Sequence, residues 1–241
     1  MAEPYLNCPP SWTRGTLSPH PEAGLILRAE SGATPSTTQP EYWDGDVAWL
    51  TPKEVTDLEG SIYVSRTQRA ITREGLASSA AKLMPPGTVM LTKRAPVGAV
   101  VVNTVPMATN QGFLNFTCGP LLLPAFLAAW LRANRPYLDA VANGSTYPEL
   151  YASDLVEFEI AVPPREYQER VIAALNAFQI VLAMESSLEQ LVVTPEDLSA
   201  VQTKARKLRS LRETLLPLLV SGEVGVGDFE ASEVTLDAVR A

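Results

Sequence analysis

The sequence offers few side chains with the types and spacing that catalysis requires. His20 is the only histidine, and it lies between Pro19 and Pro21 with no cysteine or histidine beside it. A metal site is therefore not expected. Because the chain has a single histidine, a catalytic Ser-His-Asp or Cys-His arrangement is not expected either. No run such as DPPY or NPPF is present, so a base-flipping methyltransferase site is not expected either. The residues favour a binding or scaffolding protein, with an unrecognised carboxylate enzyme as a minor alternative.

The residues best suited to binding are cations. Residues 66–94 contain six cations and one acid, Glu74, although the whole chain has a net charge of −8. Such a local excess is typical of a surface that contacts phosphates, with Ser78 and Ser79 as neutral donors. Residues 154–197 have nine acids against two arginines, so this segment is not expected to lie on DNA. The six cations are Arg66, Arg69, Arg73, Lys82, Lys93 and Arg94.

Two of the four tryptophans lie in the stretch YWDGDVAWLTPKEV, residues 42–55. Because base stacking on aromatic side chains belongs mainly to single-stranded nucleic acid, we interpret Trp43 and Trp49 as structural anchors. Trp49 is expected to begin the strand that leads to LTPKEV, and Trp43 to close the acidic turn. Lys53 is the residue of this stretch that we expect to contact DNA.

The elements that must position these side chains change in character near residue 163. Before it, short apolar runs between Pro, Gly, Ser and Thr clusters indicate strands: GLILRA, SIYVS, TVMLTK, GAVVVNTV and LVEFEIAV. One run before Pro136 has helical spacing, with Leu123, Phe126, Leu127, Trp130 and Leu131. We predict an α+β fold, with a mixed β-rich domain over residues 1–163, a long helical, coiled-coil-like region over 164–220 and a flexible tail over 221–241.

The helical region divides into two predicted helices. The first extends to about residue 191, and a second begins after Thr194-Pro195 and ends near Leu216, before Pro217 and Gly222. Both helices have an apolar face that calls for a helical partner. The predicted interface residues are Val171, Leu175, Phe178, Leu182, Leu198, Val201, Leu208, Leu211 and Leu215.

Composition supports an ordered globular chain. Apolar residues make up 46% and charged residues 19% of the sequence, and no apolar run has the length of about 20 residues that a membrane span needs. The start of the chain has no signal-peptide pattern, so we expect no membrane association and a cytoplasmic location. Cys8 and Cys118 are expected to be unpaired thiols.

Five blocks occur in an order that resembles the specificity (S) subunits of type I restriction-modification systems. The resemblance covers roughly residues 12–222. The blocks are ESGATPSTTQPEYWDGDVAWLTPKEV, ITREGLASSAAKLMPPGTVMLTKRAPVGAVVV, NQGF, NGSTYPEL and LVEFEIAVPPREYQERVIAAL. In that family a target recognition domain reads half of a bipartite DNA site, and a conserved helical region spaces the two halves and docks the modification subunits.

The resemblance implies a role in DNA reading for two polar loops. They contain Asn110 and Gln111, and Asn143, Ser145 and Thr146. Amide side chains suit adenine in the major groove, although Asn-Gly is also an ordinary turn signal. The resemblance further implies that catalysis lies on partner chains: modification subunits with S-adenosylmethionine, and restriction or translocase subunits with ATP and Mg²⁺. This chain would have no cofactor of its own.

The sequence departs from the family in having one recognition domain and one helical region instead of two of each. We therefore expect a half-subunit that forms a homodimer through its helices and reads a palindromic bipartite site. A split subunit completed by a different half and a fragment of a longer chain are alternatives. A helical interaction or scaffold protein without base readout is a further alternative, suggested by Lys204, Arg206, Lys207, Arg209 and Arg212.

Overall fold

The computed structural model describes residues 8–20, 24–58, 61–94, 96–142, 149–155, 158–189 and 195–223. The chain divides into two compact units. One, Thr13–Val162, is called the β-rich unit below. The other, called the helical unit, consists of Met1–Trp12 and Pro163–Ala241. The predicted tail beyond residue 223 and the predicted contacts Asn143, Ser145 and Thr146 lie outside the described residues.

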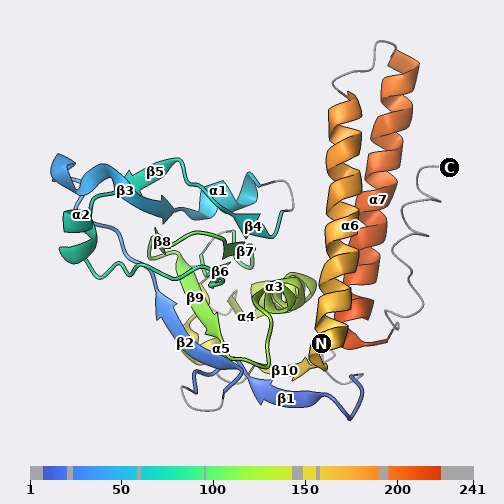
Figure 1. Cartoon of the computed structure of the whole chain (residues 1–241), viewed down its shortest axis with the longest axis horizontal. Coiled ribbons are helices and arrows are strands. Elements are labelled where there is room, and N and C mark those ends of the chain that lie inside the picture. Colours follow the sequence, from blue (N-terminus) through green and yellow to red (C-terminus); the bar gives the residue numbers. More distant parts are fainter. Residues whose placement is uncertain are drawn as a thin grey trace. The chain divides into compact units, whose positions relative to one another are not determined.

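The described strands of the β-rich unit form three sheets (Figure 1). A five-stranded sheet has the order β2-β9-β6-β7-β4, a three-stranded sheet has the order β5-β3-β8, and β1 pairs with β10. In the three-stranded sheet, β3 is antiparallel to β5 and parallel to β8. The strands are β1 Thr13–Thr16, β2 Ile26–Ser31, β3 Trp43–Leu50, β4 Tyr63–Val64, β5 Arg69–Ile71, β6 Val89–Thr92, β7 Val100–Asn103, β8 Met107–Thr109, β9 Phe113–Cys118 and β10 Glu159–Val162.

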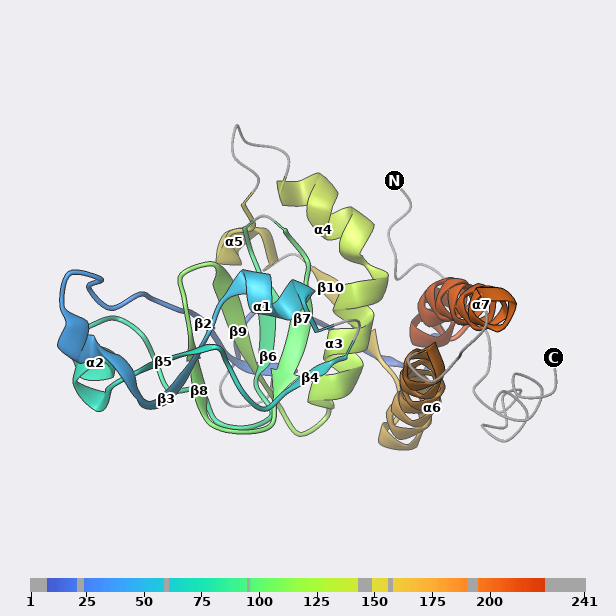
Figure 2. The same cartoon turned by 90° about the horizontal axis from the view of Figure 1, so that it is seen from above.

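Short helices connect these strands, and one longer helix covers the five-stranded sheet. Helix α3 contacts β6 and β7, and Figure 2 shows it lying alongside that sheet. Its residues 125–131 are all buried, as expected of a helix that is apolar on every side. The helices of this unit are η1 Pro40–Tyr42, α1 Pro52–Thr56, α2 Arg73–Ala77, α3 Pro124–Ala133, α4 Arg135–Ala142 and α5 Ala152–Leu155.

The core of the β-rich unit joins the two larger sheets. One apolar cluster includes Leu50, Met90, Met107 and Phe113, which come from β3, β6, β8 and β9. A second cluster packs Trp49 against Ile71 and Ala108, one residue from each strand of the three-stranded sheet. The three-stranded sheet is therefore held against the rest of the unit through buried apolar side chains.

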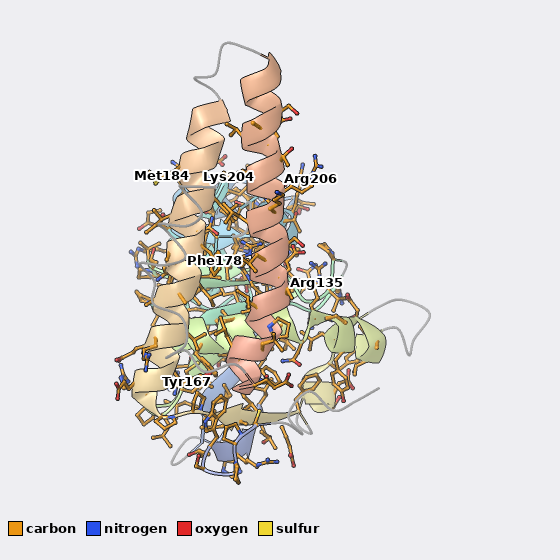
Figure 3. The ribbon with its side chains drawn as sticks, turned by 90° about the vertical axis from the view of Figure 1, so that its right-hand side faces the viewer. Arg135, Tyr167, Phe178, Met184, Lys204 and Arg206 are labelled. Atoms are coloured by element: carbon orange, nitrogen blue, oxygen red, sulfur yellow. The ribbon has the colours of Figure 1, made fainter. Side chains whose placement is uncertain are left out.

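The helical unit contains α6 (Arg165–Glu189) and α7 (Pro195–Ser221), which lie side by side (Figures 1 and 3). Leu182 and Leu208 form an apolar cluster between the two helices. At the other end, the Tyr167 hydroxyl donates to the Leu219 carbonyl at 3.1 Å. Trp12 packs on Tyr167, with ring centroids 5.1 Å apart. Two of the predicted interface side chains, Leu182 and Leu208, thus pack inside the chain.

Four of the nine predicted interface side chains are buried within the chain. Val171, Phe178, Leu182 and Leu208 are buried within the chain, so these four do not form an exposed seam. Leu175, Leu198, Val201 and Leu215 are half-buried, and Leu211 is 43% exposed. Leu182 and Leu208, which the sequence predicted to lie at an interface with another molecule, pack together between α6 and α7 of the same chain. A role of the remaining positions in pairing stays a prediction.

The α+β fold predicted from the sequence is confirmed, with local corrections. Trp49 does not begin a strand: β3 ends one residue later, and LTPKEV enters α1. The second long helix does not stop near Leu216 but passes through Pro217 to Ser221. Gly222 then has a φ of 77°, a left-handed conformation that suits glycine at a helix end.

Among the described helices, none combines the length and the apolar character that a membrane span requires. Cys8 is buried, and Cys118 is a free thiol whose pKa burial raises to about 12.

Candidate nucleic-acid interface

The predicted contact residues gather where the three-stranded sheet ends. Because β3 and β8 are parallel, both finish at the same end of the sheet, and the antiparallel β5 begins there. The segments 51–54, 65–69 and 110–112 therefore lie together, and we call them the polar end. It contains Lys53, Arg66, Arg69, Asn110 and Gln111 from the predicted contact set.

Glu54 joins two of the three segments. This carboxylate is 8% exposed and accepts hydrogen bonds from the Thr51 backbone N–H at 2.9 Å and the Thr51 hydroxyl at 2.6 Å. The bond from the Thr51 backbone N–H is one half of a capping box at the start of α1. Its other oxygen accepts from the Gln68 backbone N–H at 2.5 Å. Glu54 therefore fixes Lys53 on α1 and the segment that carries Arg66 relative to each other.

The third segment is a tight turn beside α1. The Asn110 backbone N–H donates to the Leu50 carbonyl at 3.2 Å, and the Asn110 side-chain oxygen accepts from the Gly112 N–H at 2.8 Å. A Cβ on Gly112 would lie 3.0 Å from the Pro52 ring, so the turn and the helix are in close contact. Gln111 is exposed at the tip of the turn, while the Asn110 oxygen is engaged in the turn itself.

The two tryptophans hold a fourth segment, residues 33–36, beside the polar end. The Trp49 indole N–H donates to the Ala33 carbonyl at 3.0 Å, and that of Trp43 donates to the Ser36 carbonyl at 3.1 Å. Thr34 from this segment donates its hydroxyl hydrogen to the side-chain oxygen of Gln111. The interpretation of the tryptophans as structural anchors is supported, and Thr34, which we did not predict, orients a predicted contact.

Gly32 allows this segment to approach β8. A Cβ at this position would lie 2.2 Å from the Asn110 carbonyl oxygen and 2.3 Å from that of Thr109. No other residue fits against that backbone without moving it. Glycine at position 32 therefore allows Thr34, two residues later, to reach Gln111.

The cations between residues 66 and 94 do not form one continuous basic patch. Arg73 pairs with Asp46 at 3.0 Å, Lys82 pairs with Glu30 at 2.5 Å, and Glu149 lies 3.4 Å from Lys93 and 3.1 Å from Arg94. Acids from distant parts of the sequence thus compensate four of the six cations. Of the six cations, Arg66 and Arg69 alone are exposed and have no carboxylate partner among the described residues. Lys53, which lies outside the basic stretch, is likewise exposed without such a partner.

Glu149 is held between two cations. Burial by itself raises the pKa of this carboxyl, but hydrogen bonds and charge from Arg94 and Lys93 outweigh burial and lower the pKa below its ordinary value of 4.5. The side chains of Lys93 and Glu149 are 13% and 15% exposed. Lys93 therefore has a mainly structural role, tying the segment at residue 149 to the end of β6.

The two predicted neutral donors are also engaged. The hydroxyls of Ser78 and Ser79 donate to the Gly75 carbonyl at 3.2 and 2.9 Å, which satisfies the end of α2. In this conformation neither hydroxyl hydrogen is offered to a phosphate. Their role in DNA contact stays a prediction, and in this structure they cap the end of α2.

The described residues contain no group of three or more His, Cys, Asp or Glu side chains that could hold a metal ion. His20 lies in a loop and its backbone N–H donates to the Ile26 carbonyl. The chemistry available at the polar end is therefore hydrogen bonding and charge.

The family model for the type I restriction modification DNA specificity domain matches residues 24–192. The chain belongs to this family, and the resemblance predicted from its sequence is confirmed at that level. It is 38% identical over 155 residues to the type I restriction enzyme MjaIX specificity subunit of Methanocaldococcus jannaschii, a match that covers 64% of this chain and 36% of that protein. With the HindI specificity subunit of Haemophilus influenzae it is 24% identical over 90% of this chain and 42% of that protein.

Solved structures show the same fold. The crystal structure of the HsdS subunit from Thermoanaerobacter tengcongensis matches with a TM-score of 0.53 at 18% identity, over 90% of this chain and 46% of that one. A chain from a structural study of assembly and conformational transition in the type I R-M system matches with a TM-score of 0.57 at 20% identity, over 90% of this chain and 47% of that one. In each of these four comparisons the match spans less than half of the other protein.

Proposed function

We propose that this chain reads double-stranded DNA as a specificity subunit of a type I restriction-modification complex, and that the polar end contacts the duplex. One observation carries this proposal: three segments far apart in the sequence bring uncompensated cations and an exposed amide to one end of a sheet. Those side chains are Lys53, Arg66, Arg69 and Gln111.

The side chains at the polar end suit different parts of DNA. Lys53 and Arg66 are exposed cations of the kind that position a protein on phosphates. Gln111 has donor hydrogens on its amide nitrogen, which suit the acceptor atoms of base edges in the major groove. The loop with Asn143, Ser145 and Thr146 remains a proposed contact on the basis of the family resemblance.

We assign no chemical step to this chain. Methylation of the target adenine would take place on modification subunits that bind S-adenosylmethionine and extrude the base from the duplex. Cleavage and translocation would require restriction subunits with ATP and Mg²⁺. This chain would determine the DNA sequence at which those partners act.

The helical unit offers a surface for such partners or for a second copy of the chain. Ile180 and Met184 are each 61% exposed, and with Ala173 and Ala177 they follow helical spacing on the side of α6 away from the buried Phe178. In Figure 3, Met184 of α6 and Arg206 of α7 lie at opposite outer margins of the helix pair. We propose that two copies pair through this face of α6.

Light scattering tests the pairing. The full chain at micromolar concentration is expected to have the mass of a dimer, and Ile180→Ser with Met184→Ser is expected to shift it toward the monomer. Arg206→Ser, on the outer side of α7, is the matched control. A monomeric wild-type chain would exclude the homodimer and leave pairing with a different subunit as the alternative.

Duplex binding at several salt concentrations tests the main proposal. The affinity of the full chain for its target is expected to fall steeply as salt increases, because phosphate contacts release counterions. Co-expression with the modification subunit of its complex, followed by mapping of methylated adenines, identifies that target. The rival, a helical scaffold protein, draws on the exposed cations Arg206, Lys207 and Arg209. It would bind partner protein but give no methylation at a defined sequence.

A further inference from the structure

The guanidinium of Arg69 lies on a corner made by two indole rings. Its central carbon is 3.8 Å from the ring centroid of Trp43 and 5.3 Å from that of Trp49. The two rings meet edge to face, with centroids 5.1 Å apart and planes at 87°. A planar cation stacked on an aromatic face is attracted by the ring electrons and keeps its N–H groups directed outward around its edge.

Both rings are fixed before any ligand binds. Trp49 is 3% exposed and lies directly opposite Arg69 across the β3–β5 pair. Each indole N–H donates to a carbonyl of residues 33–36, so neither ring is free to turn. Arg69 therefore loses much of its side-chain freedom in the free protein, and less is lost on binding.

The surroundings of this corner are acidic. Arg73, four residues after Arg69, is compensated by Asp46 through two hydrogen bonds of 3.2 and 3.0 Å. Three carboxylates lie within three positions of Trp43 in the sequence, and a fourth is on α2, whose Gly75 packs against the Tyr42 backbone. These carboxylates weaken the attraction of this corner for a phosphate, whereas the acceptor atoms of a base edge carry no net charge. The four carboxylates are Glu41, Asp44, Asp46 and Glu74.

We propose that Arg69, held over the ring of Trp43, reads one guanine of the target through two parallel N–H donors in the major groove. The acceptors are guanine O6 and N7, the pair that a guanidinium fork matches best among the base edges. Trp43 acts through Arg69 and is a positioning residue. This inference rests on the proposed function. It adds that Arg69 contacts a guanine and that Trp43 positions Arg69.

Selection of binding sites from randomised duplexes tests the inference on the full chain. The wild-type chain is expected to select a motif in which one guanine is preferred over the other bases by about 5- to 100-fold. Arg69→Met retains the apolar stem on Trp43 but has no donors, and it is expected to lose that preference while the rest of the motif remains. Trp43→Leu is expected to relax the same position, and Trp43→Phe, which retains a ring face, to relax it less.

The outcomes separate the two levels of proposal. A wild-type chain that selects no motif would refute the proposed function itself. A wild-type motif that Arg69→Met leaves unchanged would overturn the reading of guanine and spare the proposed function. A uniform loss of affinity for all sequences, with the salt slope lower by about one, would make Arg69 a phosphate contact and also overturn the inference.

Two controls support this reading. Arg73→Met removes a compensated cation four residues away and is expected to leave the motif unchanged. Replacement of the selected guanine by 7-deazaguanine removes the N7 acceptor alone. It is expected to weaken wild-type binding several-fold and Arg69→Met binding hardly at all. Thermal unfolding of each variant verifies folding, and Arg69→Met decides the question if Trp43→Leu is unstable.

Discussion

The cations of residues 66–94 are used in two different ways, depending on whether or not they lie at the polar end. At the polar end, Arg66 and Arg69 have no carboxylate partner among the described residues. Further along the stretch, Lys82, Lys93 and Arg94 pair with Glu30 and Glu149. A local excess of positive charge in the sequence is therefore not a measure of the charge that a surface offers to phosphates.

The double substitution Lys53→Ala and Arg66→Ala is the strongest test of this difference. We expect duplex affinity to fall by about 10- to 100-fold and the salt slope to fall by about two, because two phosphate contacts are removed. Equilibrium titrations at several salt concentrations measure both quantities.

The matched control removes two compensated cations, through Arg73→Ala and Lys82→Ala. Both are exposed ion pairs, whose interaction is worth at most about 1 kcal/mol, and we expect affinity to change by less than about threefold. Equal losses in the two double variants would show that ion pairing does not decide which cations meet DNA.

Glu54→Ala tests whether one carboxylate organises the polar end. The substitution removes the cap of α1 and leaves the backbone N–H of Gln68 without its partner. We expect the free energy of unfolding to fall by about 1–3 kcal/mol, and duplex affinity to fall as well. Glu74→Ala, an exposed acid in the first turn of α2, is the control in denaturant titrations, with an expected change within about 0.5 kcal/mol.

Glu149→Gln tests whether the ion pairs of Lys93 and Arg94 with this carboxylate stabilise the fold. Because Arg94 and Lys93 hold the folded-state pKa of this carboxyl below 4.5, its contribution to stability is present above that pH. The contribution is lost as pH falls through the lowered pKa. We therefore expect wild-type stability to decline more steeply than that of the variant below pH 4.5. Parallel pH profiles of the unfolding free energy would count against this role.

Thr34→Val is expected to have the smallest effect. It removes the hydroxyl that orients Gln111 and retains the shape of the side chain. One hydrogen bond contributes about 0.5–1.5 kcal/mol, so we expect duplex affinity to fall by no more than about tenfold, with unchanged stability. Thr38→Val, whose hydroxyl bonds only to Ser36 among the described residues, is the control. Equal effects of the two substitutions would remove Thr34 from the site.

The strands with continuous β-branched runs were predictable from the sequence. GAVVVNTV and TVMLTK contain β7 and β6. Both strands are buried on both faces, so their sequences do not need to alternate between apolar and polar residues. The three-residue strands β5 and β8 give too short a pattern to recognise, and β9 has a buried Asn115 in its middle. Such elements are fixed by their neighbours, not by their own composition.

The site was only partly predictable for a related reason. Arg69 and Gln111 were identified by residue type and resemblance, but the ion pairs that engage Lys82 and Arg94 join residues more than fifty positions apart. No local pattern reports such pairs. Glu54 did have a local signal, since Thr51 and Glu54 have capping-box spacing, yet its bond to Gln68 depends on the sheet.

The tryptophans hold residues 33–36 through backbone carbonyls. A carbonyl is common to every amino acid, so mutation can replace the side chains at positions 34, 36 and 37 while these attachments persist. Evolution can then vary the chemistry displayed beside the polar end without first repairing the fold. Under the proposed function, such a frame would let new target preferences arise through single substitutions.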